Sequence, residues 1–268
     1  MRSLIKVGFG LLILAFVLIA LFYSMLRAQG TTRPANPEGR VVASETREVG
    51  KNITSVELGG PIDMTLRQGA MASLTVRGEQ RLLGNIETMS EGATLHIETK
   101  GMLLHHKQPL QVVLVLPAID KLRILGSGDS TVNGFSGDKI DLQLHGSGNV
   151  KFNGRYREVD AGLQGSGDIE LNGGNCDQVD VNAAGSGSMT VVGAAKRFKV
   201  VQTGSGDLDA EHLSADAVTV ELTGSGSVIV QARKSAAVNL RGSGEVNVHG
   251  NPDERSVTRS GSGDVTFE

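Results

Sequence analysis

The chain has 268 residues, with 36 glycines, no tryptophan, two tyrosines and seven phenylalanines, and its net charge at pH 7 is −3. This charge balance gives no support for a nucleic-acid-binding domain, because phosphate recognition requires a clustered excess of lysine and arginine. A chain so poor in aromatic residues is expected to have a narrow core filled by stacked valine, leucine and isoleucine.

An uncharged run from residue 7 to residue 26 follows Arg2 and Lys6. Twenty helical residues at about 1.5 Å per residue span about 30 Å of hydrocarbon. We therefore expect residues 1–28 to be an uncleaved signal anchor, with a transmembrane helix at 7–26 that makes the membrane a partner. The alternative is a cleaved signal peptide, although the Leu26-Arg27-Ala28 cleavage site would be poor. In both cases the charges before the run predict that the remainder is exported.

Residues 29–50 contain Pro34, Pro37 and scattered charges without hydrophobic periodicity, which predicts an extended linker. Alternation of apolar and polar residues begins near residue 51, as at Ile53, Val56 and Leu58. Alternation with a period of two is typical of strands with one buried face. We predict a β-helix domain over 51–268, with irregular coils and a cap at 51–120 and no helix outside the apolar N-terminal run.

One tripeptide, Gly-Ser-Gly, recurs eight times within residues 121–268, at intervals of 18 to 20 residues. A fixed period in this range indicates a solenoid, in which neighbouring repeats bury each other's apolar faces. The predicted structural corners are Gly126, Gly128, Gly146, Gly148, Gly165, Gly167, Gly185, Gly187, Gly204, Gly206, Gly224, Gly226, Gly242, Gly244, Gly261 and Gly263.

Numbered from the first glycine of each corner, the residues at even offsets are mainly apolar and those at odd offsets are mainly polar. About 19 residues per repeat is too short for a propeller blade of about 40. The prediction is all-β: a single-stranded parallel β-helix with coils of about 19–20 residues. Both glycines are expected to face inward, with the serine outward. Either a pinched wall or a left-handed dihedral angle at one glycine would explain the glycines.

The segment before the repeats and the repeats themselves show a family pattern. It reads Arg47-Glu48-Val49, Ile53, Val56-Glu57-Leu58, Ile62-Asp63-Met64, Gln68-Gly69, Leu74-Thr75-Val76 and Leu95-His96-Ile97, followed by repeated Gly-Ser-Gly-Asp. Over residues 45–268 the chain resembles the putative auto-transporter adhesin, head GIN domain family. The resemblance implies a right-handed β-helix in the bacterial cell envelope and supplies no catalytic residues.

The residue after each corner forms an acidic ladder in which acid alternates with neutral until the last pair. Its members are Asp129, Asn149, Asp168, Ser188, Asp207, Ser227, Glu245 and Asp264. Adjacent coils lie about 4.8 Å apart, so alternation separates the carboxylates by about 9.6 Å and avoids like charges in direct contact. Calcium needs several oxygens within about 2.6 Å of one ion, so we expect charge spacing and no metal site here.

Other candidate chemistry is sparse. The eight corner serines, Ser127 through Ser262, lack a base and an orienting partner, and Asn133, Asn153 and Asn172 suggest turns and an amide ladder. His105-His106 lack a third zinc ligand at metal spacing. Cys176 is the only cysteine, so an internal disulfide is impossible, although an exposed thiol there would be able to cross-link two chains. We expect no catalytic residues, cofactor or metal.

These observations favour a non-catalytic, membrane-tethered adhesion or binding module of the cell envelope, whose ligand is an unidentified envelope glycan or protein. One alternative is a structural protein whose coils stack end to end. A second is a carbohydrate-active β-helix enzyme, but such enzymes are expected to carry aromatic sugar platforms. Tyr156 is the only tyrosine or tryptophan beyond the apolar N-terminal run.

The last repeat departs from its own pattern, because Arg255 and Arg259 stand where earlier coils place inward apolar residues. Inward-pointing charge on a terminal strand guards a sheet edge against edge-to-edge association. We expect the two arginines to act as such a guard, unless the last coil frays and its register carries no meaning.

Overall fold

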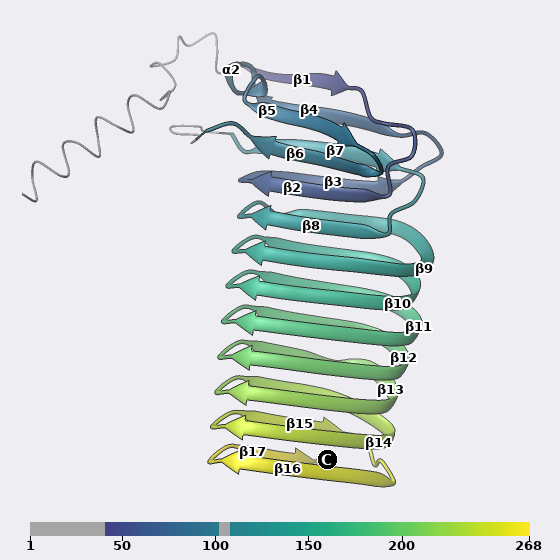
Figure 1. The fold of residues 1–268 in the computed structure, drawn as a ribbon, viewed down its shortest axis with the longest axis vertical. Helices are drawn as coiled ribbons and strands as arrows, with labels where there is room; N and C mark the ends of the chain where they lie inside the picture. The colour runs from purple at the N-terminus through teal and green to yellow at the C-terminus, as the bar shows by residue number, and fades with distance from the viewer. Residues whose placement is uncertain (1–40, 102–107) are drawn as a thin grey trace, which may run out of the picture.

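A computed structural model describes residues 41–101 and 108–268 as a single long stack of β-strands (Figure 1). The expected transmembrane run at 7–26, most of the expected linker and the His105-His106 pair lie outside the described residues. In the two described ranges, no helix has the length and apolar character needed to cross a membrane.

The N-terminal cap, residues 41–101 and 108–116, holds one short helix and seven strands. These are β1 (Val42–Arg47), β2 (Ser55–Gly60), β3 (Ile62–Gln68), β4 (Ser73–Glu79), α2 (Gln80–Leu83), β5 (Ile86–Glu91), β6 (Thr94–Thr99) and β7 (Leu110–Leu116). The stack continues through β8 (Lys121–Gly126), β9 (Ser130–Gly146), β10 (Asn149–Gly165), β11 (Asp168–Gly185), β12 (Ser188–Gly204), β13 (Asp207–Gly224), β14 (Ser227–Gly242), β15 (Glu245–His249), β16 (Glu254–Gly261) and β17 (Asp264–Phe267).

Each long strand forms one flattened coil. In β10 an outgoing half, residues 149–153, pairs in parallel with its neighbours, and a returning half, residues 158–165, does the same. Val150 and Phe152 of the outgoing half and Val159 and Leu163 of the returning half are all buried. The two halves therefore enclose the aliphatic core that the alternation predicts, and the solenoid is confirmed as parallel from β8 onward.

Two different edges join the halves. We call the Gly-Ser-Gly edge the narrow corner and the opposite edge, residues 153–158 in β10, the wide bend (Figure 1). The register is continuous at the narrow corner, where Gly146, Gly165 and Gly185 are successive partners. Register shifts occur at the wide bend, as between Asn153 and Glu158. The variation in repeat length is therefore absorbed at the wide bend.

The N-terminal cap is not built from successive coils as expected. The coil formed by β2 and β3 lies between β6–β7 on one side and β8–β9 on the other, although β4 to β7 intervene in the sequence. Strand β4 runs antiparallel to β1 and β7, and β5 runs antiparallel to β6. Alternation alone does not distinguish parallel from antiparallel pairing, which is why the sequence did not reveal this.

Two boundaries also differ from expectation. Strand β1 pairs with β4 over residues 42–47, inside the segment predicted as a linker up to residue 50. Helix α2 contradicts the prediction that no helix occurs outside the N-terminal run, and it buries Leu82 and Leu83. Four residues are too short to show a helical period, so packing rather than pattern determines this helix.

The narrow corner is held by backbone hydrogen bonds between coils. The carbonyl oxygen of Gly165 accepts the N–H groups of both Ser186 and Gly187, at 3.0 and 3.2 Å. The Gly185 carbonyl accepts those of Ser205 and Gly206 in the same way, at 3.0 and 3.1 Å. Two successive N–H groups directed at one oxygen form a backbone nest, the type of concavity that binds anions elsewhere.

This nest explains the glycines differently from the sequence prediction. A Cβ on any first glycine would lie 2.0–2.3 Å from the carbonyl oxygen of its partner in the preceding coil, and a Cβ on any second glycine would lie 2.0–2.5 Å from that of its own partner there. Seven first glycines also have φ between 122° and 148°. The second glycines are buried, but the first are not, so the expectation that both face inward is wrong for the first. The contact that excludes a Cβ is therefore with the backbone of the adjacent coil in the stack.

At the C-terminal end, Arg255 and Arg259 occupy the inward register, paired with Ala236 and Leu240. The Arg255 guanidinium lies 4.9 Å from the centre of the Phe267 ring, and Arg259 donates to the Gly263 carbonyl. The backbone register of both residues is therefore the inward one of earlier coils, but both residues are exposed. Their role against association stays a prediction.

We expect Gly185→Val to lower the free energy of unfolding by at least about 2 kcal/mol, because it combines left-handed strain with a backbone clash. The exposed Ser186→Ala variant, one residue away, should change it by no more than about 0.5 kcal/mol. Thermal denaturation of the two variants measures the difference. Equal shifts in melting temperature would contradict the nest as the reason for the glycines.

Candidate functional site

The acidic ladder at the narrow corner completes the backbone hydrogen bonding. Asp129, Asp168 and Asp207 each accept, through Oδ1, the N–H of the corresponding residue in the next coil. Where the preceding residue is neutral, the N–H of Asp168 or Glu245 goes to the carbonyl of a second glycine instead. The hydrogen-bond acceptor therefore alternates with the sequence until Asp264, whose N–H goes to the Gly244 carbonyl although the preceding ladder residue is Glu245. Among the described residues no group of three or more acids, histidines or cysteines could hold a metal ion.

The remaining sequence candidates lie apart from one another. Asn153 donates to Asn133 at 3.2 Å, but Asn172 instead accepts the N–H of Gly174, so the amide ladder extends over only two coils. Cys176 is buried and its thiol lies 3.4 Å from the Gly173 carbonyl. Burial, with a smaller effect from Asp177, raises its pKa to about 11. Cys176 is therefore not an exposed thiol, so cross-linking of two chains through it, which the sequence left open, is not supported.

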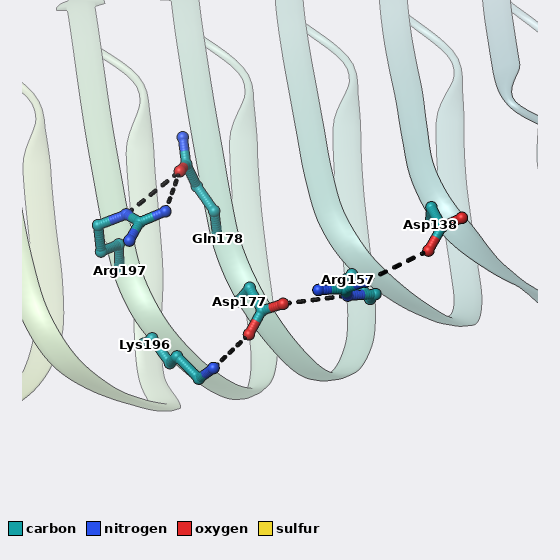
Figure 2. A network of polar contacts seen from close by, with 6 residues as sticks. All are labelled: Asp138, Arg157, Asp177, Gln178, Lys196 and Arg197. Atoms are coloured by element: carbon teal, nitrogen blue, oxygen red, sulfur yellow. Dashed lines mark hydrogen bonds and ion pairs between the residues drawn. The ribbon is translucent and has the colours of Figure 1, made fainter.

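A charged ladder that the sequence analysis missed runs along the wide bend (Figure 2). We call it the bend ladder, and its members stand eight residues before the next Gly-Ser-Gly: Asp138, Arg157, Asp177, Lys196, Asp216 and Lys234. Arg157 lies 3.8 Å from Asp138 and 3.1 Å from Asp177, and Lys196 lies 2.6 Å from Asp177. Counting backward from the following glycine would have revealed this alternation, whereas counting forward obscures it because the wide bend varies in length.

The ion pairs of the bend ladder affect its carboxylates. Hydrogen bonds from Lys196 and then Arg157 hold the pKa of Asp177 below its ordinary value. A hydrogen bond from Lys234 does the same for Asp216. Because exposed ion pairs contribute little to stability, this ladder mainly fixes the relative positions of neighbouring bends. Its cations are paired with its acids, which leaves little charge for a ligand.

Beside the ladder, the wide bend of three adjacent coils encloses a hollow of about 570 Å³. It is lined by Gly134, Phe135, Ser136, Asn153, Gly154, Arg155, Asn172 and Gly174. Three of these lining residues are glycines, which add no side chains to the hollow. Gly134 and Gly174 have φ of 90° and 74°, and a Cβ on Gly154 would lie 2.7 Å from the Phe152 ring. The volume lies within the range typical of small-ligand sites.

The polar groups around the hollow have unused hydrogen-bonding capacity. Asn172 uses its carbonyl oxygen on the Gly174 N–H, which leaves its NH₂ group to donate. Asn153 uses its NH₂ group on Asn133, which leaves its carbonyl oxygen to accept. Arg155 lines the hollow without a hydrogen bond or ion pair to any residue that the structure describes. These free groups make the hollow a candidate site for a polar ligand.

Comparison with known proteins identifies the family. The model of the putative auto-transporter adhesin, head GIN domain family matches residues 52–252. The chain belongs to this family. No functionally curated protein shows significant sequence similarity to it.

Solved structures share the fold of this family member. A putative adhesin from Parabacteroides distasonis has a TM-score of 0.79 at 21% identity, covering 86% of this chain and 98% of its own. A putative lipid binding protein from the same species has 0.77 at 22%, covering 85% and 96%. A putative adhesin from Bacteroides fragilis has 0.65 at 19%, covering 86% and 99%. At these identities the likeness shows the fold alone.

In this member of the family, three aspartates also align on the outer face of the returning halves. Asp160 is the register partner of both Asp141 and Asp180. Burial, with the charges of Asp141 and Asp180, raises the pKa of Asp160, and Lys139 opposes this in part. Asp141 has its own partners, Lys121 at 3.2 Å and Gln143 at 2.8 Å. Asp160, between two other aspartates, is therefore the carboxylate of the three whose ionised form is most disfavoured.

We expect Asp160→Asn to raise the melting temperature at pH 7. The folded pKa of Asp160 lies above its ordinary value of 3.8, so ionisation at neutral pH opposes folding. The gain should shrink as the pH falls through the raised pKa and vanish below 3.8, where the side chain is protonated in both states. Asp138→Asn, whose side chain is 92% exposed, is the control and should change little. A stabilisation of Asp160→Asn that persists unchanged at pH 3 would refute the electrostatic cause.

Proposed function

We propose that this protein is a non-catalytic adhesion or binding module of the bacterial cell envelope, a right-handed β-helix whose ligand docks at the wide bend. The observation that carries the proposal is the hollow, where Arg155, Asn153 and Asn172 retain free hydrogen-bonding groups on a rigid scaffold. Membership of a family described as adhesins supports a binding role at the cell surface.

The proposal includes export and a membrane tether. The uncharged run at 7–26, preceded by Arg2 and Lys6, has the length and flanking charges of a signal anchor. The described body begins at residue 41, so the 14 residues from 27 to 40 would connect the membrane to the cap. A tether of this length would hold the solenoid close to the membrane surface.

Two other roles have less support. End-to-end stacking would join the last coil to the cap, where β1 and β4 pair antiparallel and do not continue the parallel coil pattern. The Parabacteroides protein named as lipid binding shares the fold, but here the space between the two halves of each coil is filled by buried side chains. An enzymatic role would need a paired acid and base, and the acids of the narrow corner are engaged with backbone N–H groups.

To test the tether, the full chain is expressed in its host and fractionated. We expect it in the membrane fraction, resistant to extraction at high pH, with an intact mass that includes residues 1–28. Replacement of Leu12 and Leu14 by lysine should move it out of that fraction, because charges in the hydrocarbon are costly. Recovery of a soluble exported form lacking these residues would show that the segment is a cleaved signal peptide.

To test the binding site, the full chain is screened on an array of envelope and host-surface glycans, alongside two matched variants. Ser136→Trp places a bulky side chain in the hollow, and Ser205→Trp places the same side chain at the narrow corner. Both serines are exposed, so both variants should fold. We expect Ser136→Trp to weaken binding at least about tenfold and Ser205→Trp to leave it unchanged. Equal binding by the two variants, or no glycan binding by the native chain, would contradict the proposed site.

A further inference from the structure

Two arginines that lie two residues apart in β10 differ in their contacts. Arg157 belongs to the bend ladder and contacts Asp138 and Asp177. Arg155 lines the hollow and has neither an ion pair nor a hydrogen bond to any described residue. Its stem lies beside the next coil, where its Cγ would be 3.3 Å from a Cβ on Gly174. A glycine at that position therefore leaves room for the Arg155 side chain against the next coil.

The groups beside Arg155 combine donors with an acceptor. The free NH₂ group of Asn172 and the guanidinium of Arg155 are both donors, and they line the same hollow. Arginine binds carboxylates through two parallel N–H donors, and such charge-assisted bonds are stronger than neutral ones. The free carbonyl oxygen of Asn153 can accept only from a hydroxyl or an N–H group. A carboxylate next to a hydroxyl or an N–H group therefore satisfies all three side chains.

The shape of the hollow narrows the choice further. Gly134, Gly154 and Gly174 contribute no side chains, so a ring can approach the backbone closely. A volume of about 570 Å³ accommodates one or two sugar rings. Phe135 is buried at the hollow with only 1% of its surface exposed, so its ring offers a ligand almost no apolar contact area.

We propose that the hollow binds an acidic saccharide, with the sugar carboxylate on Arg155 and Asn172 and a neighbouring hydroxyl on Asn153. This inference rests on the proposed binding function and names its ligand class. Arg155 supplies the charge, and the two asparagines select the orientation. Arg157 carries the same charge nearby but is committed to the bend ladder, so it does not contribute.

The test uses oligogalacturonate and its methyl ester, which share a sugar backbone and differ in the free carboxylates. Binding of each to the full chain is measured by calorimetry, together with Arg155→Gln and Arg157→Gln. We expect the acid form to bind at least about tenfold more tightly than the ester, and Arg155→Gln to remove that difference. Arg157→Gln should retain it within about twofold.

The possible failures can be told apart. If the native chain binds the ester as well as the acid, and Ser136→Trp abolishes both, the binding function stands and the acidic preference is overturned. If Arg157→Gln removes the preference as completely as Arg155→Gln, the effect is general electrostatics and the assignment to Arg155 fails. If neither saccharide binds but a synthetic polyglutamate peptide does so through Arg155, the ligand is an acidic protein segment and the saccharide proposal is overturned.

Discussion

The nest at the narrow corner is the contact on which the rest of the solenoid depends. A single glycine carbonyl oxygen accepts two successive N–H groups from the next coil, at distances of 3.0–3.2 Å for Gly165 and Gly185. The approach is so close that a Cβ on either glycine would lie within about 2.5 Å of a neighbouring carbonyl oxygen. Serine is tolerated between the glycines because its side chain points to solvent. The repeat is thus set by backbone geometry, and the aliphatic core fills the space that this geometry encloses.

Because the register is continuous at the narrow corner, differences in repeat length are confined to the wide bend. Insertions and deletions that change the repeat between 18 and 20 residues occur at the wide bend, where register shifts are found. The same edge carries the bend ladder and the hollow. In solenoids, loops at one edge can vary in length and sequence without disturbing the contacts that stack the repeats. Here the narrow corner keeps the stacking contacts and the wide bend varies. The acids of the narrow corner belong to the rigid side because they accept backbone N–H groups of the next coil.

The sequence predicted much of this fold because its strongest signals are local and repeated. Alternation identified the buried faces, and the glycine period identified the coil. It did not predict the path of β4 to β7, because antiparallel pairing depends on contacts between segments distant in sequence. The strand at 42–47 was mistaken for linker, since most of its residues are exposed and show no alternation.

The candidate site was harder to predict, for physical reasons. Arg155 and Asn153 lie on one coil and Asn172 lies on the next. The hollow between them also depends on the absence of side chains at Gly134 and Gly174. The asparagines were noticed as turn residues, but their free hydrogen-bonding groups depend on which atoms the neighbours occupy. Arg157 stands out from Arg155 in the sequence only when positions are counted backward from the following glycine, and this count does not show that Arg155 has no partner.

Amide hydrogen exchange measured by NMR tests the central claim most directly. Ser186, Ser205 and Ser243 are exposed residues whose N–H groups belong to the nest and donate to a glycine carbonyl oxygen of the preceding coil, at 3.0, 3.0 and 2.9 Å. If the nest holds the stack together, these amides should exchange as slowly as those of buried strand residues such as Val200. Exchange of the three serine amides at the rate of exposed loop amides, with the strands still protected, would contradict the account.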